Sequence, residues 1–176
     1  MNKNWLKSYP DGMPHDIAPD DYASLVHLLE VAMATHDKRV AFRCMGASLT
    51  YGQLERLSAR VAGWLQAQGL EPGARVAVMM PNILQYPVAV LGILRAGCVV
   101  VNVNPLYTPR ELEHQLRDSG ADAVFILENF ATTLQSVVHG CGVRHVVVAS
   151  MGDLMGPAKG AVTNWMVRRV RKLVPR

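Results

Sequence analysis

Paired metal ligands are missing from this sequence of 176 residues. Its three cysteines, Cys44, Cys98 and Cys141, form no CxxC spacing, and its six histidines form no HxxxH or HExxH pair. An odd number of cysteines without such spacing does not indicate a disulfide framework, and Cys98 opens an apolar run that suits a buried thiol. We therefore predict that the chain holds no metal site and belongs to a reducing, cytoplasmic compartment.

Motifs for phosphate binding and for nucleophilic catalysis are missing too. The sequence contains no GxxxxGK[ST], GxGxxG or GxSxG, and no serine, histidine and acid in a recognisable order. Enzymes that use ATP usually hold its phosphates with backbone N–H groups and a lysine on a glycine-rich loop. Gly152, Gly156 and Gly160 are spaced four apart around a proline, which indicates a turn or mobile loop instead. We predict no catalytic residue in this chain.

Neither a secretory signal nor a membrane-spanning segment is indicated. Residues 1–23 contain lysines but no apolar core of about seven residues or more, so we interpret them as an extended arm punctuated by prolines. The most hydrophobic window, residues 83–103, is interrupted by Pro87, Arg95 and Gly97. It therefore divides into a helix and a strand rather than crossing a bilayer.

Positive charge is concentrated at the C-terminus. Six basic residues and no acidic ones lie in residues 158–176, whereas the remaining chain has twelve basic and fourteen acidic side chains. The six are Lys159, Arg168, Arg169, Arg171, Lys172 and Arg176. A nucleic-acid-binding tail is the alternative, but Trp165 is its one aromatic residue and no known binding motif accompanies it. We predict no nucleic-acid partner.

The first half of the chain predicts a helix, a hairpin and a second helix. Ser24 is placed to cap a helix that ends near residue 35 or 36, and strands at 40–44 and 48–50 flank a turn at Gly46. The second helix begins with a capping box at Thr50 and Gln53, and Gly69 supplies its left-handed stop. Thr108 and Glu111 form a second capping box farther along the chain.

Four apolar segments alternate with helical patterns in the second half of the chain. They are Arg75–Met80, Cys98–Val103, Ala123–Leu127 and His145–Ala149. This alternation predicts an α/β fold, flavodoxin-like or Rossmann-like, with a parallel sheet and helices on both faces. We expect Val76–Met80 and Val99–Val103 at the centre of the sheet. The predicted organisation is an arm (1–23), an α/β subdomain (24–150) and a loop with a basic segment (151–176).

Polar residues follow two of these strands and are the candidates for binding on the substrate side. Pro81 and Asn82 follow the first strand, and Asn104 and Tyr107 follow the second. In open α/β sheets, ligands gather outside the carboxyl ends of the strands. The alternative is that these residues only cap helices and form turns, and their spacing leaves both interpretations open.

The basic segment predicts an amphipathic helix over Val162–Val174. At 100° per residue, its apolar residues share one broad face with Trp165 at the margin, while Arg168, Arg171 and Lys172 group opposite. Arg169 departs from this pattern, because it falls inside the apolar arc and would have to snorkel. Such a helix is typical of elements that lie on anionic membrane surfaces, and the candidates for a membrane-surface contact are Trp165, Arg168, Arg171 and Lys172. The alternative is a solvated basic helix packed on the body of the protein, or a disordered end.

Four segments in order carry a resemblance to one family. LTYGQLE, PNILQYPVAVLGILRAG, VVNVNPLYTPRELEHQL and NWMVRRVRKLVPR resemble landmarks of the bacterial long-chain fatty acid–CoA ligases, which are AMP-forming, adenylate-forming enzymes. The resemblance covers nearly the whole chain. It implies the N-terminal part of an enzyme that joins a fatty acid to coenzyme A through an acyl-adenylate, using ATP and Mg²⁺.

The same resemblance sets further expectations. The family's phosphate loop, its metal-associated glutamate and its C-terminal lysine would all lie beyond Arg176, so the chain alone should be inactive. The family also implies a peripheral position on the inner face of the cytoplasmic membrane, and dimer contacts. Two alternatives stay open at this point: a stand-alone, non-catalytic α/β module that binds a nucleotide or partner, and a ligase for medium-chain or aromatic acids.

Overall fold

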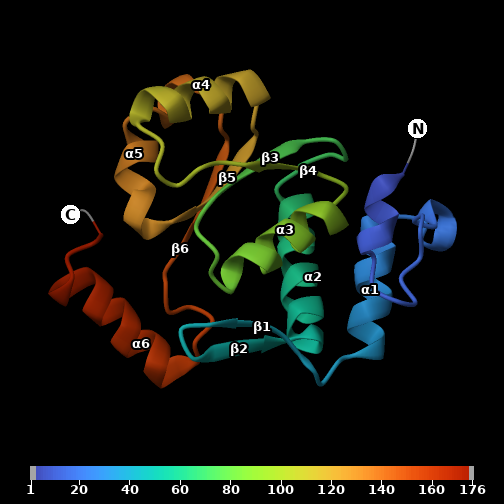
Figure 1. Cartoon of the computed structure of the whole chain (residues 1–176). Coiled ribbons are helices and arrows are strands. Elements are labelled where there is room, and N and C mark those ends of the chain that lie inside the picture. The colour runs from blue at the N-terminus through green and yellow to red at the C-terminus, as the bar shows by residue number, and fades with distance from the viewer. Residues whose placement is uncertain (1–2, 175–176) are drawn as a thin grey trace.

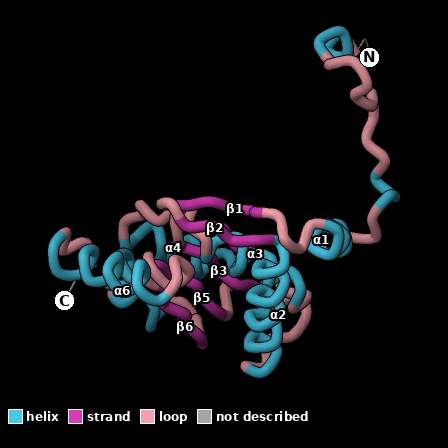
Figure 2. The backbone as a smooth tube through the Cα atoms, turned by 90° about the horizontal axis from the view of Figure 1, so that it is seen from below, coloured by secondary structure: helices cyan, strands magenta, loops and turns pink. Residues whose placement is uncertain are grey.

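The computed structural model describes residues 3–174, which form an α/β layer with a small hairpin beside it (Figure 1). In order, the helices and strands are α1 (Leu25–Thr35), β1 (Val40–Cys44), β2 (Ala47–Thr50), α2 (Tyr51–Ala67), β3 (Arg75–Met79), α3 (Gln85–Arg95), β4 (Val99–Asn102), α4 (Pro109–Ser119), β5 (Ala123–Leu127), α5 (Ala131–Gln135), β6 (His145–Ala149) and α6 (Pro157–Trp165). A π-helical segment, Met166–Val170, continues α6. Residues 4–8 and 19–21 are short 3₁₀ turns in an arm that projects from the body (Figure 2).

The main sheet is parallel and has the strand order β4-β3-β5-β6. The first strand, β3, therefore lies between the second and the third, which is the flavodoxin-like order with a switch point between β3 and β5. This arrangement confirms the α/β prediction. It also shows that one detail was wrong, because β4 is an edge strand and β5 takes the central place beside β3.

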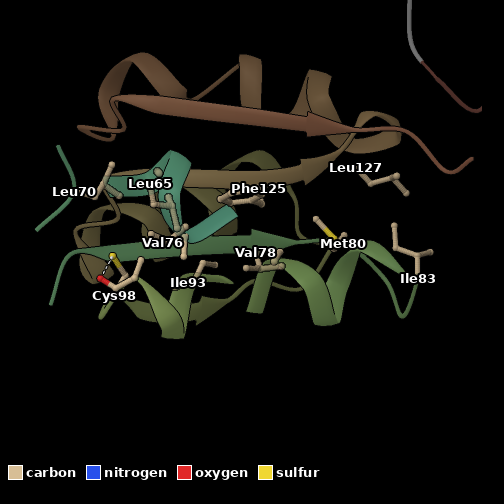
Figure 3. Close-up of a cluster of buried hydrophobic side chains, with 14 residues drawn as sticks. Leu65, Leu70, Val76, Val78, Met80, Ile83, Ile93, Cys98, Phe125 and Leu127 are labelled. Carbon is tan, nitrogen blue, oxygen red and sulfur yellow. Dashed lines mark hydrogen bonds between the residues drawn. The ribbon is translucent and has the colours of Figure 1, made fainter. Parts of the chain in front are cut away.

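Side chains of the central strands alternate between two apolar layers, as the pleat requires. Val76 and Val78 of β3 pack toward α2 and α3, where Leu65 and Ile93 complete the layer (Figure 3). The residues between them, Ala77 and Met79, face the second layer, which is built by α4 and α5. All five residues of β5 are buried. The central strands are continuously apolar because helices cover both faces of the sheet there.

The edge strand β6 departs from the expected burial. Its sequence, HVVVA, is as apolar as the central strands, yet Val146 and Val148 are 43% and 53% exposed. The helix that precedes it, α5, has only five residues and leaves these two side chains uncovered. A run of apolar residues therefore does not distinguish a central strand from an edge strand whose cover is missing.

The predicted hairpin and caps are confirmed. Met45 and Gly46 take positive φ angles of 49° and 68° at the turn between β1 and β2. The Thr50 hydroxyl accepts from the backbone N–H of Gln53 at 3.2 Å, and the Gln53 side chain accepts from the Thr50 N–H at 2.8 Å. The hairpin and α1 lean on α2 and α3 through a third apolar cluster. Sequence patterns between neighbouring residues therefore predicted the hairpin and the helix caps correctly.

The capping box of α4 makes the stability of this helix depend on pH. Hydrogen bonds from the backbone N–H and the hydroxyl of Thr108 hold the pKa of the Glu111 carboxyl below its usual range. A lowered folded-state pKa stabilises the protein above the unfolded-state value, about 4.3, and the effect is lost as the pH falls through the folded-state value. We expect wild type to be more stable than Glu111→Gln at about pH 6 and the two to converge as the pH falls through the folded-state pKa of Glu111.

Urea unfolding of both proteins across this pH range is the measurement. Thr108→Ala provides the control, because it removes the hydroxyl donor and should reduce the pH dependence that Glu111→Gln abolishes. A stability difference that grew toward acid would contradict the assignment.

Candidate functional site

Polar residues gather at the carboxyl edge of the parallel sheet. Asn82 follows β3, Asn104 follows β4, Glu128 follows β5 and Ser150 follows β6. Parallel strands end at the same edge, so one polar residue per strand produces a row of side chains across the sheet. The sequence prediction identified the first two of these residues and missed the last two.

Asn82 lines an apolar pocket. This pocket has a volume of about 480 Å³ and lies between α1, β1 and the start of α3. Its walls are mainly leucine side chains, with one phenylalanine, one isoleucine, one valine and one proline, and Arg43, Asn82 and Tyr86 supply the polar groups. The thiol of Cys44 donates to the Asn82 carbonyl at 3.7 Å, which ties the hairpin to the turn after β3.

A hydrogen-bond chain joins the helices around β4. The Tyr86 hydroxyl donates to Oδ1 of Asn102 at 2.9 Å, and the side-chain amide of Gln115 donates to the Asn102 carbonyl at 2.9 Å. Asn102 therefore links α3 to α4 across the end of the strand. Its place inside an apolar strand segment was the signal that sequence reasoning left unused.

Asn104 and Tyr107 lie in a turn between β4 and α4. Oδ1 of Asn104 accepts from the Leu106 N–H at 3.0 Å, and the Tyr107 N–H donates to the Asn104 carbonyl at 3.1 Å. Tyr107 is half-buried against the α4 layer. The Pro81 carbonyl accepts from Ile83 in a similar local turn. Among residues 3–174, no hydrogen bond joins these residues to Asn82, so a shared binding role for all four stays a prediction.

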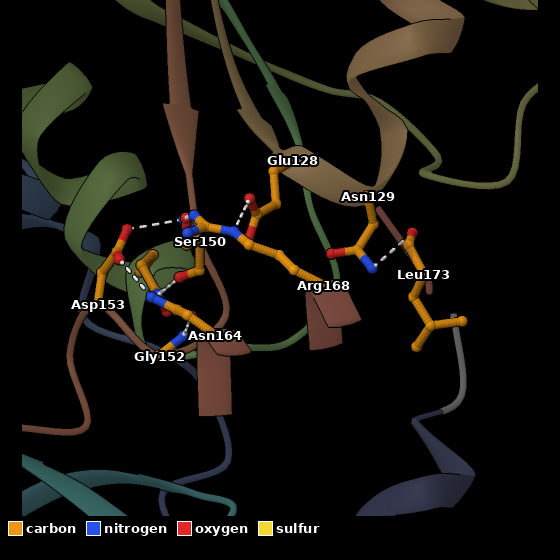
Figure 4. A network of polar contacts seen from close by, with 9 residues as sticks. Glu128, Asn129, Ser150, Gly152, Asp153, Asn164, Arg168 and Leu173 are labelled. Carbon is orange, nitrogen blue, oxygen red and sulfur yellow. Dashed lines mark hydrogen bonds and ion pairs between the residues drawn. The ribbon is translucent and has the colours of Figure 1, made fainter. Parts of the chain in front are cut away.

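The most connected polar site at this edge centres on Glu128 and Arg168 (Figure 4). Arg168 Nε donates to Glu128 Oε2 at 2.9 Å, and its Nη2 donates to the Ser150 hydroxyl at 2.7 Å. The Glu128 side chain is only 9% exposed, so this ion pair is largely shielded from water on one side. Glu128 comes directly after the apolar strand β5, and Asn82 comes three residues after the end of β3, so a similar pattern indicates both in the sequence.

Two of the three glycines in the C-terminal region, Gly152 and Gly160, serve close packing. A Cβ atom on Gly152 or on Gly160 would meet the carbonyl oxygen of the other, so α6 crosses the 150–155 turn backbone to backbone. Asn164 strengthens this crossing, because its Oδ1 accepts from the Gly152 N–H at 2.7 Å. Interpreting these glycines as a turn or mobile loop was therefore incomplete, since Gly160 is a helical contact residue.

The predicted helix over Val162–Val174 is wrong in its bounds and in the role of one arginine. Helix α6 begins at Pro157, the π-helical segment ends at Val170, and Lys172 takes a positive φ of 49° that stops the helix. Arg168 is directed at Glu128 and is not part of a free basic face. Arg171 and Lys172 are exposed, whereas Arg176 lies outside the described residues.

The carboxyl edge does not fit the phosphates of ATP. Buried oxygens without a hydrogen-bond partner include Glu128 Oε1 and Asn129 Oδ1, and these are acceptors, whereas phosphate oxygens require donors. Among the described residues, no group of three histidine, cysteine or acidic side chains converges as metal ligands. No helix of residues 3–174 is long and apolar enough to cross a bilayer.

Comparison with known proteins places the chain in one family. The AMP-binding enzyme family matches residues 29–167. A long-chain-fatty-acid–CoA ligase of Escherichia coli O6:H1 is 53% identical over 100% of this chain and 32% of its own length. A ligase of the same description from Haemophilus influenzae is 47% identical with the same coverage. The chain thus spans about a third of the length of these relatives.

Solved structures agree with the fold. A benzoate CoA ligase from Burkholderia xenovorans aligns with a TM-score of 0.67 and 28% identity, over 78% of this chain and 27% of the other. A long-chain-fatty-acid-CoA ligase from Archaeoglobus fulgidus aligns with a TM-score of 0.69 over 84% of this chain and 32% of the other, at 24% identity. The family match, the relatives and the shared fold together show that this chain belongs to the AMP-binding enzyme family.

Proposed function

We propose that this chain is the N-terminal α/β portion of a long-chain fatty acid–CoA ligase. Such an enzyme converts a fatty acid, ATP and coenzyme A into acyl-CoA, AMP and pyrophosphate through an acyl-adenylate. The observation that carries the proposal is 53% identity to a long-chain-fatty-acid–CoA ligase over the whole of this chain. Full coverage at this identity favours a shared role for the segment more strongly than a fold likeness does.

In this proposal the chain contributes structure and substrate-side surface, and the chemistry belongs to other segments. The carboxyl edge offers acceptor oxygens and no phosphate cradle, so ATP and Mg²⁺ would be held outside it. Asn82 and Tyr86, in the apolar pocket beside α3, are the strongest candidates of this chain for contact with a substrate or a neighbouring domain. Asn104 and Tyr107 are weaker candidates, because their polar contacts are local.

An aromatic or medium-chain acid is the second candidate substrate. Its support is the fold likeness to the benzoate CoA ligase at 28% identity. The 53% identity to the long-chain ligase is the stronger observation. We further propose a cytoplasmic enzyme that associates peripherally with the inner face of the membrane and forms dimer contacts, as the family resemblance implies.

A chimaeric enzyme tests the proposal. This chain would replace the corresponding first third of the E. coli relative, and pyrophosphate release from ATP would be measured with palmitate and with benzoate. We expect release that depends on palmitate in the chimaera, and background release from the 176-residue chain alone. The matched control is the relative without its first third, which should be inactive.

Two results would contradict the proposal. A folded chimaera that preferred benzoate would move the assignment to the aromatic-acid ligases. Pyrophosphate exchange by the isolated chain would show that it is a complete enzyme of another kind.

A further inference from the structure

The C-terminal helical arm, residues 157–171, is amphipathic in the reverse sense to an ordinary surface helix. Two of its polar side chains face the protein, since Asn164 binds Gly152 and Arg168 binds Glu128 and Ser150 (Figure 4). A surface helix normally buries its apolar stripe against the core and presents its polar side to water. Here polar contacts fix the arm to the body and orient it.

The apolar side of the arm faces away from the protein. Val162, Trp165, Met166 and Val170 are 58%, 60%, 45% and 57% exposed and follow one another at helical spacing. We call these four residues the outer stripe. Val167, one step around the helix, is buried and shows the direction of the body. The hydrogen bonds of Asn164 and Arg168 to the body keep this contiguous apolar stripe facing outward, and such a stripe marks an interaction surface.

Positive charge lies within and beside the outer stripe, since Arg169 falls between Trp165 and Val162 at helical spacing. Arg169, Arg171 and Lys172 are exposed, and within residues 3–174 none of them takes part in an ion pair. Residues 154–176 include no aspartate or glutamate. An apolar stripe with an exposed tryptophan and nearby unopposed cations, whose long side chains can reach the headgroups, matches the chemistry of an anionic bilayer interface.

We propose that the outer stripe inserts into the interfacial layer of an anionic lipid bilayer, with Arg169, Arg171 and Lys172 on its headgroups. The contacts of Asn164 and Arg168 would hold the arm parallel to the membrane and fix which side of the body faces it. This deepens the peripheral association named above and rests on the proposed function only for its biological purpose. The arm should bind anionic vesicles whether or not the chain is part of a ligase.

Vesicle co-sedimentation of the 176-residue chain tests the contribution of charge. Vesicles of phosphatidylethanolamine with phosphatidylglycerol should bind the chain, and phosphatidylcholine vesicles should bind it far less. Each cation near an anionic surface increases the affinity for the membrane about fivefold. The double substitution Arg169→Gln with Arg171→Gln should therefore weaken binding about thirtyfold. The matched control, Arg56→Gln with Arg60→Gln on the exposed side of α2, should change it much less.

Tryptophan quenching tests which side of the arm enters the membrane. A variant that retains only Trp165 should be quenched by brominated lipids, and a variant that retains only Trp5, in the N-terminal arm, should not. Replacing Val162, Met166 and Val170 by serine should reduce vesicle binding by about tenfold or more. These side chains are exposed, so the fold should persist, and circular dichroism checks this.

Three outcomes would overturn the proposal. The first is vesicle binding that does not depend on lipid charge, and the second is no quenching of Trp165 in the bound state. The third is a dimer, detected by light scattering, that becomes a monomer in the serine variant. The last would assign the stripe to a second copy of the chain. No ATP, coenzyme A or fatty acid is present in these measurements, so failure of the ligase proposal would leave them unchanged.

Discussion

Placing an aspartate in the centre of β5 is expected to unfold the protein or nearly so. Ile126 is completely buried, pairs in register with Met79 of β3, and packs in the layer formed by α4 and α5. Ile126→Asp would bury a carboxylate with no partner, which costs several kcal/mol, and we expect a loss of about 4 kcal/mol or more. Urea unfolding monitored by circular dichroism is the measurement.

The edge strand β4 supplies graded controls for this experiment. Val101 is half-buried against the same layer, and Val99, two residues before it, is 47% exposed. Val101→Asp should therefore cost less than Ile126→Asp, and Val99→Asp should cost about 1 kcal/mol or less. Equal losses at Ile126 and Val99 would mean that the observed strand order is incorrect.

Alanine substitutions at two glycines of α2 and α3 should change the free energy of unfolding in opposite directions. A Cβ on Gly92 would lie 2.5 Å from Cβ and Cγ1 of Val61 and 3.0 Å from the Ser58 carbonyl oxygen. Gly92→Ala forces the two helices apart, so we expect a destabilisation of about 2 kcal/mol in spite of the better helix propensity of alanine. Thermal and urea unfolding both report this loss.

Gly63 is the matched control on α2. A Cβ at this position meets no atom within 4 Å, so alanine gains helix propensity without a clash. We expect Gly63→Ala to stabilise the protein by about 0.5–1 kcal/mol. Stabilisation by both substitutions would show that the helices do not approach closely at Gly92.

Local chemistry explains why much of the fold was predictable. The capping boxes at Thr50 and Thr108 depend on residues three apart, and the hairpin turn depends on Gly46, so nearby side chains determine these elements. The alternation of apolar strands and helices likewise predicted a parallel sheet, which the structure confirms. These signals act over one turn or one strand and do not need the rest of the chain.

Strand order and burial at the edges depended on contacts between distant segments. The β4 run, VVVN, and the β5 run, AVFIL, look alike as apolar sequence, yet the first is an edge and the second a centre. Which side of β3 each strand joins is decided by the direction in which its helix crosses the sheet. The exposed Val146 and Val148 of β6 show the same limit.

The carboxyl-edge site divides in the same way. The sequence by itself determined that polar residues follow apolar strands, that the tail is basic, and that the chain contains no GxxxxGK[ST] or GxGxxG motif. Only the tertiary structure decided that Arg168 reaches 40 residues back to Glu128 and so turns the apolar side of the arm outward. The physical reason is that a buried carboxylate requires a partner charge. The ion pair of Glu128 with Arg168 therefore sets the orientation of the arm, which the apolar pattern of the tail does not predict.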